Sequence, residues 1–266
     1  METAFDKIAE RYDAEFTYSA VGIRQRRRVW HYLDRVYPKG VSLDVLELNC
    51  GTGEDAIHMA NMGHHVVATD VSKMMVHATE KKARRMGVED RVIARQLSIQ
   101  DLTEFDFDNK FDLIFSDFGG LNCVDKEELQ RLVRVASRLL KPGGRLVGVV
   151  MPKMCAWESI YFGIKGKFKK AFRRMTKREV SVNIEGNLQS TWYHSPGTLY
   201  SIFSSEFELK RIRPIGFFLP PSYLDPFFSK HLRTLSTLEK MEKKCGSVAM
   251  LATFSDHYLI DFEVKR

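Results

Sequence analysis

Two glycines and a group of acids in the stretch 43–70 have residue types and a spacing that could bind a ligand. The stretch contains an apolar run, a glycine bend, a helix-like run, a second apolar run and an acid: Val45–Leu48, Gly51 and Gly53, Glu54–Met62, His65–Thr69 and Asp70. In an open parallel sheet, ligands bind beyond the carboxyl ends of the strands. Glycines let the backbone approach such a ligand without a Cβ. The Asp70 carboxylate could then accept hydrogen bonds from both hydroxyls of a ribose.

Two classes of ligand are compatible with this bend. A dinucleotide would use the pattern G-x-G-x-x-A, which Gly51, Gly53 and Ala56 satisfy. The following helix opens with Glu54 and Asp55, which suit the helix dipole but would repel a pyrophosphate. The stretch contains four acids, Glu47, Glu54, Asp55 and Asp70. Together they favour a ligand with positive charge, such as a sulfonium with an ammonium group. A NAD-linked oxidoreductase remains the alternative.

The residues 47–53, with the sequence E-L-N-C-G-T-G, resemble the first motif of class I S-adenosylmethionine (SAM) methyltransferases, E/D-x-G-x-G-x-G. Asn49 stands in place of the first glycine, which alters the hydrogen bonding beside the methionine end. Asp70–Met74 is similar to the ribose-binding acid and the adenine-packing residues of the family, and residues 139–146 resemble its L-K-P-G-G-x-L turn. The resemblance covers residues 5–152 and implies that SAM is the cofactor.

Three further segments resemble parts of the same family. Residues 5–13 are similar to the F-D-x-x-A-x-x-Y-D opening, which forms a lid in the family. Residues 97–102 resemble its adenine-binding segment. Residues 116–122 resemble a stretch of ubiquinone and menaquinone methyltransferases. Ser98 stands where the family has the adenine-binding acid. Its hydroxyl could accept the hydrogen bond from the exocyclic amine of adenine, but without charge assistance. The resemblance implies these cofactor-binding residues: Tyr12, Glu47, Asn49, Gly51, Gly53, Asp70, Val71, Met74, Ser98, Ile99, Ser116 and Asp117.

The chemistry implied by the cofactor requires mainly alignment, because a sulfonium methyl group is already electrophilic. A hydroxyl or amine acceptor also benefits from a base. His194 is the first candidate because its intrinsic pKa lies near neutrality, and Asp117 and Tyr193 follow. A structural role for a histidine next to a turn is the alternative. No metal site is expected, because the four cysteines are scattered without a C-x-x-C pair.

Strands and helices alternate along residues 41–151, which predicts a parallel sheet with right-handed crossovers. The predicted strands are Val45–Leu48, His65–Thr69, Val92–Gln96, Leu113–Ser116 and Arg145–Met151; the helices are Glu54–Met62, Lys73–Met86 and Lys126–Leu140. We predict an α/β fold, Rossmann-like and doubly wound, with seven mostly parallel strands. Residues 1–40 form a helical lid, 152–207 an insertion, and 208–266 the rest of the sheet with a helical insertion. Leu209–Phe218 is the predicted sixth strand, and the resemblance implies that Tyr258–Val264 lies antiparallel at the end of the sheet.

The insertion 152–207 combines apolar residues at helical spacing with many cations. Residues 157–178 predict a basic amphipathic helix, which could lie on an anionic membrane or cover a lipophilic acceptor; a solvated lid helix is the alternative. Val180–Ile184 and Leu188–Tyr193 predict a hairpin. Aromatic residues of this insertion and of 219–228 could wall an acceptor pocket. The run Arg24 to Arg28 is typical of a solvated helix face, so nucleic-acid contact is not favoured.

Composition agrees with a globular enzyme: 266 residues, 44% hydrophobic and 28% charged, with a net charge of +7. The sequence shows no signal peptide and no membrane-spanning run, and the thiols are expected to be reduced, so we expect a cytoplasmic protein. The sequence thus predicts a SAM-dependent methyltransferase for a small aromatic or lipophilic metabolite, with O-methylation favoured over C- or N-methylation. An RNA or protein methyltransferase and a non-catalytic cofactor-binding protein are further alternatives, and the oligomeric state is left open.

Overall fold

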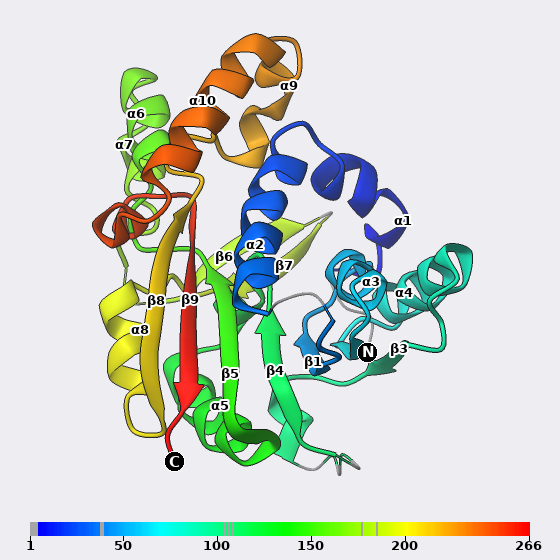
Figure 1. Ribbon diagram of the computed structural model, residues 1–266. Coiled ribbons are helices and arrows are strands. Elements are labelled where there is room, and N and C mark those ends of the chain that lie inside the picture. The colour runs from blue at the N-terminus through cyan, green and yellow to red at the C-terminus, as the bar shows by residue number, and fades with distance from the viewer. Residues whose placement is uncertain are drawn as a thin grey trace.

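A seven-stranded mixed sheet forms the frame of the chain (Figure 1). The computed structural model describes residues 5–37, 40–103, 105, 107, 109–176, 178–184 and 186–266. The strand order is β3-β2-β1-β4-β5-β9-β8, and β1 to β5 run parallel. The bounds are β1 Asp44–Leu48, β2 His65–Asp70, β3 Val92–Gln96, β4 Phe111–Ser116, β5 Leu140–Val150, β8 Phe207–Ile215 and β9 His257–Val264. The predicted Rossmann-like sheet is confirmed.

The last strand, β9, is antiparallel as predicted, but its predicted place at the end of the sheet is wrong. It lies between β5 and β8 and pairs antiparallel with both. The side chains explain this place, because Tyr258, Leu259, Ile260 and Phe262 are all completely buried. A strand that is apolar on both faces loses most free energy at an exposed edge, so it takes an interior position.

Helices cover both faces of the sheet and bury two separate apolar cores. On one face pack α5 (Lys126–Leu139) and α8 (Pro196–Phe203); on the other pack α2 (Gly22–Val36) and α3 (Glu54–Asn61). The remaining long helix of the core, α4 (Lys73–Met86), begins after Ser72, whose hydroxyl accepts a hydrogen bond from the Met75 amide at 3.1 Å. The three helices predicted between residues 54 and 140 are confirmed.

The N-terminal segment is fixed against the carboxyl end of the sheet. It contains α1 (Ala9–Tyr12) and a π-helical turn, Asp13–Thr17. The Asp6 carboxylate accepts from the Ser72 hydroxyl (2.6 Å) and the Met74 amide (3.1 Å), so it adds a second cap to α4. Pro38 and Lys39, expected to end this helical section, lie outside the described residues.

The insertion after β5 forms two short helices and a hairpin, with α6 at Ala156–Ile164, α7 at Phe168–Ala171, β6 at Val180–Ile184 and β7 at Asn187–Thr191. The predicted hairpin is confirmed, but the single helix predicted over 157–178 is wrong. Gly166 has φ +68° in the turn between α6 and α7, and this left-handed conformation ends the helix. Lys177 and Glu185 lie outside the described residues.

Several aromatic residues of the two insertions contact one another. Beyond the hairpin, the chain forms α9 (Asp225–Phe228) and α10 (Leu232–Cys245). Trp157 of α6 contacts Phe228 edge-on with ring centroids 5.7 Å apart, over a small core that includes Val21 and Leu219. That these aromatics wall an acceptor pocket stays a prediction. In the part of the chain that the structure describes, no helix is both long and apolar enough to cross a bilayer.

Candidate functional site

The glycine bend after β1 is joined directly to the acid at the end of β2. The Asp70 carboxylate accepts from the Gly51 amide through Oδ2 and from the Ser72 amide through Oδ1, each at 2.9 Å. Gly51 has φ +54° and Gly53 has φ +76°, in the region where glycine avoids a steric penalty. Burial raises the pKa of Asp70, while the two amide bonds act in the opposite direction. The predicted juxtaposition of Asp70 and the bend is therefore present.

Asn49, in the place of the first motif glycine, keeps a glycine-like backbone with φ +57°. Asparagine is one of the few residues that adopt this conformation routinely. Its Oδ1 atom is buried and makes no hydrogen bond with any described residue. A Cβ added to Gly120 would lie 2.5 Å from that Oδ1, so Gly120 provides the space that the Asn49 side chain occupies. The site thus presents an unpaired buried acceptor beside the bend.

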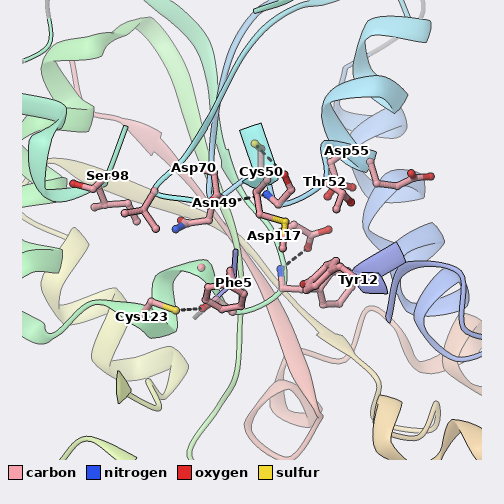
Figure 2. A pocket seen from close by; sticks show the side chains of 18 of the residues that line it. Phe5, Tyr12, Asn49, Cys50, Thr52, Asp55, Asp70, Ser98, Asp117 and Cys123 are labelled. Atoms are coloured by element: carbon pink, nitrogen blue, oxygen red, sulfur yellow. Dashed lines mark hydrogen bonds between the residues drawn. The ribbon is translucent and has the colours of Figure 1, made fainter. Parts of the chain in front are cut away.

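A cavity of about 240 Å³ lies at the carboxyl ends of β1, β2 and β4 and extends to the N-terminal segment (Figure 2). Its walls come from the lid, the bend and three strand ends. The lining residues with predicted cofactor roles are Tyr12, Asn49, Gly51, Asp70, Val71, Ser98, Ile99 and Asp117. Gly53 lies behind the bend, where an added Cβ would come within 2.5 Å of Thr79. The sequence therefore located most of the cavity, although the roles of these residues stay predictions.

The acids at the start of α3 are paired with cations of the protein. Asp55 accepts a hydrogen bond from Arg26 and one at 2.6 Å from the Trp30 indole. Glu54 accepts from Lys82 at 3.0 Å. Both acids nevertheless line the cavity, so their part in binding a cationic ligand stays a prediction.

A second pair of buried carboxylates is less well compensated. Asp117, at the end of β4, shares Arg26 with Asp55, and its Oδ2 lies 3.2 Å from the Arg26 guanidinium. Glu47 has an Oε2 atom without a partner among the described residues. Burial raises the pKa of both groups well above the usual value, and the Asp55 charge adds to it. Three buried carboxylates therefore face a single guanidinium, so their negative charges are not fully compensated when all three are ionised.

At the other end of the cavity, Ser98 and its neighbours form a small polar group. The Ser98 hydroxyl donates to Asp101 at 2.6 Å, and the Gln100 amide donates to Glu128 at 2.8 Å.

Two consecutive methionines lie in the first turn of α4 and differ in their exposure. Met75 lines the cavity and is 1% exposed, whereas Met74 is 40% exposed and does not line the cavity. The position predicted for Met74 is therefore wrong by one residue of the helix.

His194, Tyr193 and Ser116 are not among the residues that line the cavity in the described part of the chain. His194 is buried, and its Nε2 lies 3.3 Å from the Val124 carbonyl. Burial lowers the pKa of His194 to about 4, so the ring is neutral near pH 7. Tyr193 packs against Arg174, 5.4 Å from ring centre to guanidinium carbon. Of the three predicted catalytic residues, the structure brings only Asp117 to the cavity.

Arg26 is the main site residue that the sequence analysis missed. It belongs to the run Arg24 to Arg28, which was expected to be solvated, yet it is 9% exposed and stacks 5.1 Å from the Phe118 ring. A signal was present, because Arg26 lies three and seven residues before the core residues Val29 and Leu33 and so shares their helix face. Gln189 of β7 also lines the cavity and shows that the hairpin reaches it.

Fold and site together define a class of protein. The sheet has the order of a doubly wound Rossmann-like fold, and its ligand site lies at the point where strand order reverses, between β1 and β4. A glycine bend with an acid at the end of the next strand is suited to a ligand with a ribose. The protein is therefore a Rossmann-like α/β protein with a nucleoside-cofactor site.

Comparison with known proteins narrows this class. Residues 45–144 match the family model described as a methyltransferase domain. A demethylmenaquinone methyltransferase of Clavibacter sepedonicus is 36% identical over 145 residues, 54% of each chain. A ubiquinone/menaquinone biosynthesis C-methyltransferase of Blochmanniella pennsylvanica is 30% identical over 151 residues, 55% of this chain and 56% of that protein.

Among solved structures, the CcbJ methyltransferase of Streptomyces caelestis is similar over 100% of this chain and 99% of its own, with a TM-score of 0.63 and 16% identity, which supports the fold alone. The methyltransferase-domain match and these relatives support a class I SAM-dependent methyltransferase, with SAM as the cofactor. It matches the curated relatives over about half of their length.

Proposed function

We propose that the chain transfers the methyl group of SAM to a small lipophilic or aromatic acceptor. The observation that carries this proposal is the Asp70 carboxylate, held by the Gly51 and Ser72 amides at the edge of an open cavity. The relatives named for menaquinone and ubiquinone methylation support an acceptor of this kind. When bound, SAM supplies an electrophilic methyl group on a sulfonium.

The residues of this chain fit the cofactor in charge and in hydrogen bonding. Asp70 would hold the ribose hydroxyls, and Ser98 and Ile99 would border the adenine. The unpaired Oδ1 of Asn49 is an acceptor suited to an ammonium group, and the carboxylate excess formed by Glu47, Asp55 and Asp117 favours a cation. These assignments rest on the orphaned acceptor and on the charges of the site.

For the acceptor, Asp117 is the polar group at the end of β4 that the geometry favours. Its carboxylate is oriented by Arg26 and by the Phe118 amide at 2.9 Å, so it would position an acceptor and take up a proton if one is released. Oxygen was the favoured atom from sequence, but the cavity offers no unpaired base among its described residues. An acceptor that is nucleophilic without deprotonation, such as an electron-rich ring carbon, would fit this site as well.

Isothermal titration calorimetry and a transfer assay would test the proposal. SAM and S-adenosylhomocysteine should bind to the wild type, and Asp70→Asn should bind at least about tenfold more weakly, because a charge-assisted hydrogen bond contributes about 1.5–3 kcal/mol. Asp90→Asn, on an exposed turn, is the matched control. Radioactive methyl transfer to a panel of hydroxynaphthalenes and quinols would then test the acceptor class. Absence of cofactor binding to the wild type would refute the proposal.

A further inference from the structure

The positive charge of the chain is concentrated in one surface segment. Residues 156–178 contain eight lysine or arginine residues and one glutamate, and the rest of the chain contains 33 basic and 33 acidic residues. The whole formal excess of +7 therefore belongs to α6, α7 and the residues that follow them. The single acid, Glu158, is buried and pairs with Arg173 and with Arg174, which is itself buried and also pairs with Asp256. The exposed cations around the turn are therefore Lys165, Lys167, Lys169 and Lys170.

The same segment exposes apolar side chains that would ordinarily be buried. The turn between α6 and α7 is flanked by Ile164 and Phe168, which are 84% and 64% exposed. Ile160, Phe172 and Met175 are also more than half exposed. Figure 1 shows α6 and α7 projecting at the end of the molecule toward which β4 points. Contiguous exposed apolar groups of this kind mark an interaction surface.

The cations around this turn are available for a partner. Lys167 and Lys169 make no ion pair with any residue in the described ranges. The Lys165 ammonium lies over the Tyr161 ring, 4.1 Å from its centre, and donates a hydrogen bond to the Tyr161 hydroxyl, while the side chain stays exposed. Basic groups around an apolar tip have the composition of segments that bind at the boundary of anionic lipid headgroups and acyl chains.

We propose that residues 156–176 form a docking surface for an anionic phospholipid bilayer, with Ile164 and Phe168 inserted below the headgroups and Lys167 and Lys169 among the phosphates. RNA would also attract the cations, but it offers no apolar phase for the aliphatic side chains of Ile160, Ile164 and Met175. The bilayer satisfies both features of the surface. This inference rests on the surface alone and does not require the proposed methyl transfer.

Co-sedimentation with vesicles would test the proposal, using phosphatidylcholine alone and phosphatidylcholine mixed with phosphatidylglycerol. The wild type should bind the mixed vesicles. Ile164→Ser and Phe168→Ser should each lower the partition coefficient of the protein onto the mixed vesicles by about tenfold. Lys167→Glu with Lys169→Glu should weaken it by about fivefold or more for each lysine. The matched controls are Met86→Ser with Ile93→Ser, and Lys81→Glu with Lys126→Glu, at exposed positions on other elements.

Either of two results would overturn the proposal: no binding of the wild type to the mixed vesicles, or binding that the Ile164 and Phe168 changes leave intact. Filter retention of oligouridylate without vesicle binding would instead assign the surface to RNA. Titration with S-adenosylhomocysteine should give the same affinity for the wild type and the serine variant. That measurement shows that the variant is folded, and it separates a failure of docking from a failure of the proposed function.

Discussion

The contact between Asn49 and Gly120 predicts a measurable energetic coupling. An alanine Cβ at position 120 would lie 2.5 Å from Oδ1, 2.7 Å from Cγ and 2.8 Å from Cβ of Asn49. A rotation of the amide alone cannot relieve this clash, because the Asn49 Cβ is fixed by its backbone at φ +57°. Overpacking of this kind costs about 1–3 kcal/mol. Gly120→Ala should therefore lower the free energy of unfolding by about 2 kcal/mol.

Asn49→Gly removes the clashing atoms and also the strain of a non-glycine residue in the left-handed region. In that background, Gly120→Ala should be neutral or should stabilise by up to about 0.5 kcal/mol, because Gly120 has no positive φ and alanine reduces the entropy of the unfolded chain. The two substitutions should thus show a coupling energy of about 2 kcal/mol.

Urea denaturation of the four proteins in this double-mutant cycle would measure the coupling. Gly197→Ala is the control, since its added Cβ meets nothing within 4 Å in α8 and should stabilise by about 0.5–1 kcal/mol. If Gly120→Ala is equally tolerated with Asn49 and with glycine at position 49, the close packing of these two residues is refuted.

Three further changes test the lid, the buried charges and the histidine. Lys82→Met should remove the ion pairs to Asp13 (2.8 Å) and Glu54 (3.0 Å), and hydrogen exchange of residues 5–18 should then become faster, whereas Lys81→Met should leave it unchanged. Arg26→Met should lower the free energy of unfolding by about 3–5 kcal/mol, since two buried carboxylates lose their shared partner; a loss below about 1 kcal/mol in urea melts would contradict this. His194→Gln should keep methyl transfer and its pH profile intact. Because the pKa of His194 falls from 6.5 to about 4 on folding, the unfolded chain binds the extra proton, and stability falls as pH drops between these values. The variant should lack this loss of up to about 3 kcal/mol in urea melts at pH 7.5 and 4.5.

The sequence predicted the features that depend on the periodicity of elements and on the ends of strands. Asp70 and the Gly51 bend could be placed together because parallel neighbouring strands end at the same edge of a sheet. Arg26 could not be distinguished from Arg27 by residue type, and only its helical phase with Val29 and Leu33 separates the buried arginine from the exposed one. Met74 and Met75 differ in the same way, because a shift of one residue turns a side chain by about 100° around the helix.

Long-range packing accounts for the remaining errors. Trp157 and Tyr161 contact Phe228 and Tyr223, whereas Phe168 and Phe172 are more than half exposed. A sequence pattern does not specify which of these apolar surfaces meet. The break between α6 and α7 has a local signal, since Gly163 and Gly166 lie within the predicted helix. His194 illustrates the opposite case: its residue type suggests a base, but its burial beside the Val124 carbonyl is a tertiary property.

The charge balance around β1 and β4 distinguishes the two classes of ligand that the glycine bend alone admits. Glu47, Asp55 and Asp117 are buried with one guanidinium between them. Burial raises the pKa of Glu47 and Asp117, and the Asp55 charge raises it further. A pyrophosphate would add charge of the same sign in a region of low dielectric, where repulsion is weakly screened. A cationic ligand reduces that repulsion and restores the carboxylates toward their ionised form. The electrostatics therefore favour SAM over a dinucleotide even though Arg26 and Lys82 neutralise the two acids at the start of α3.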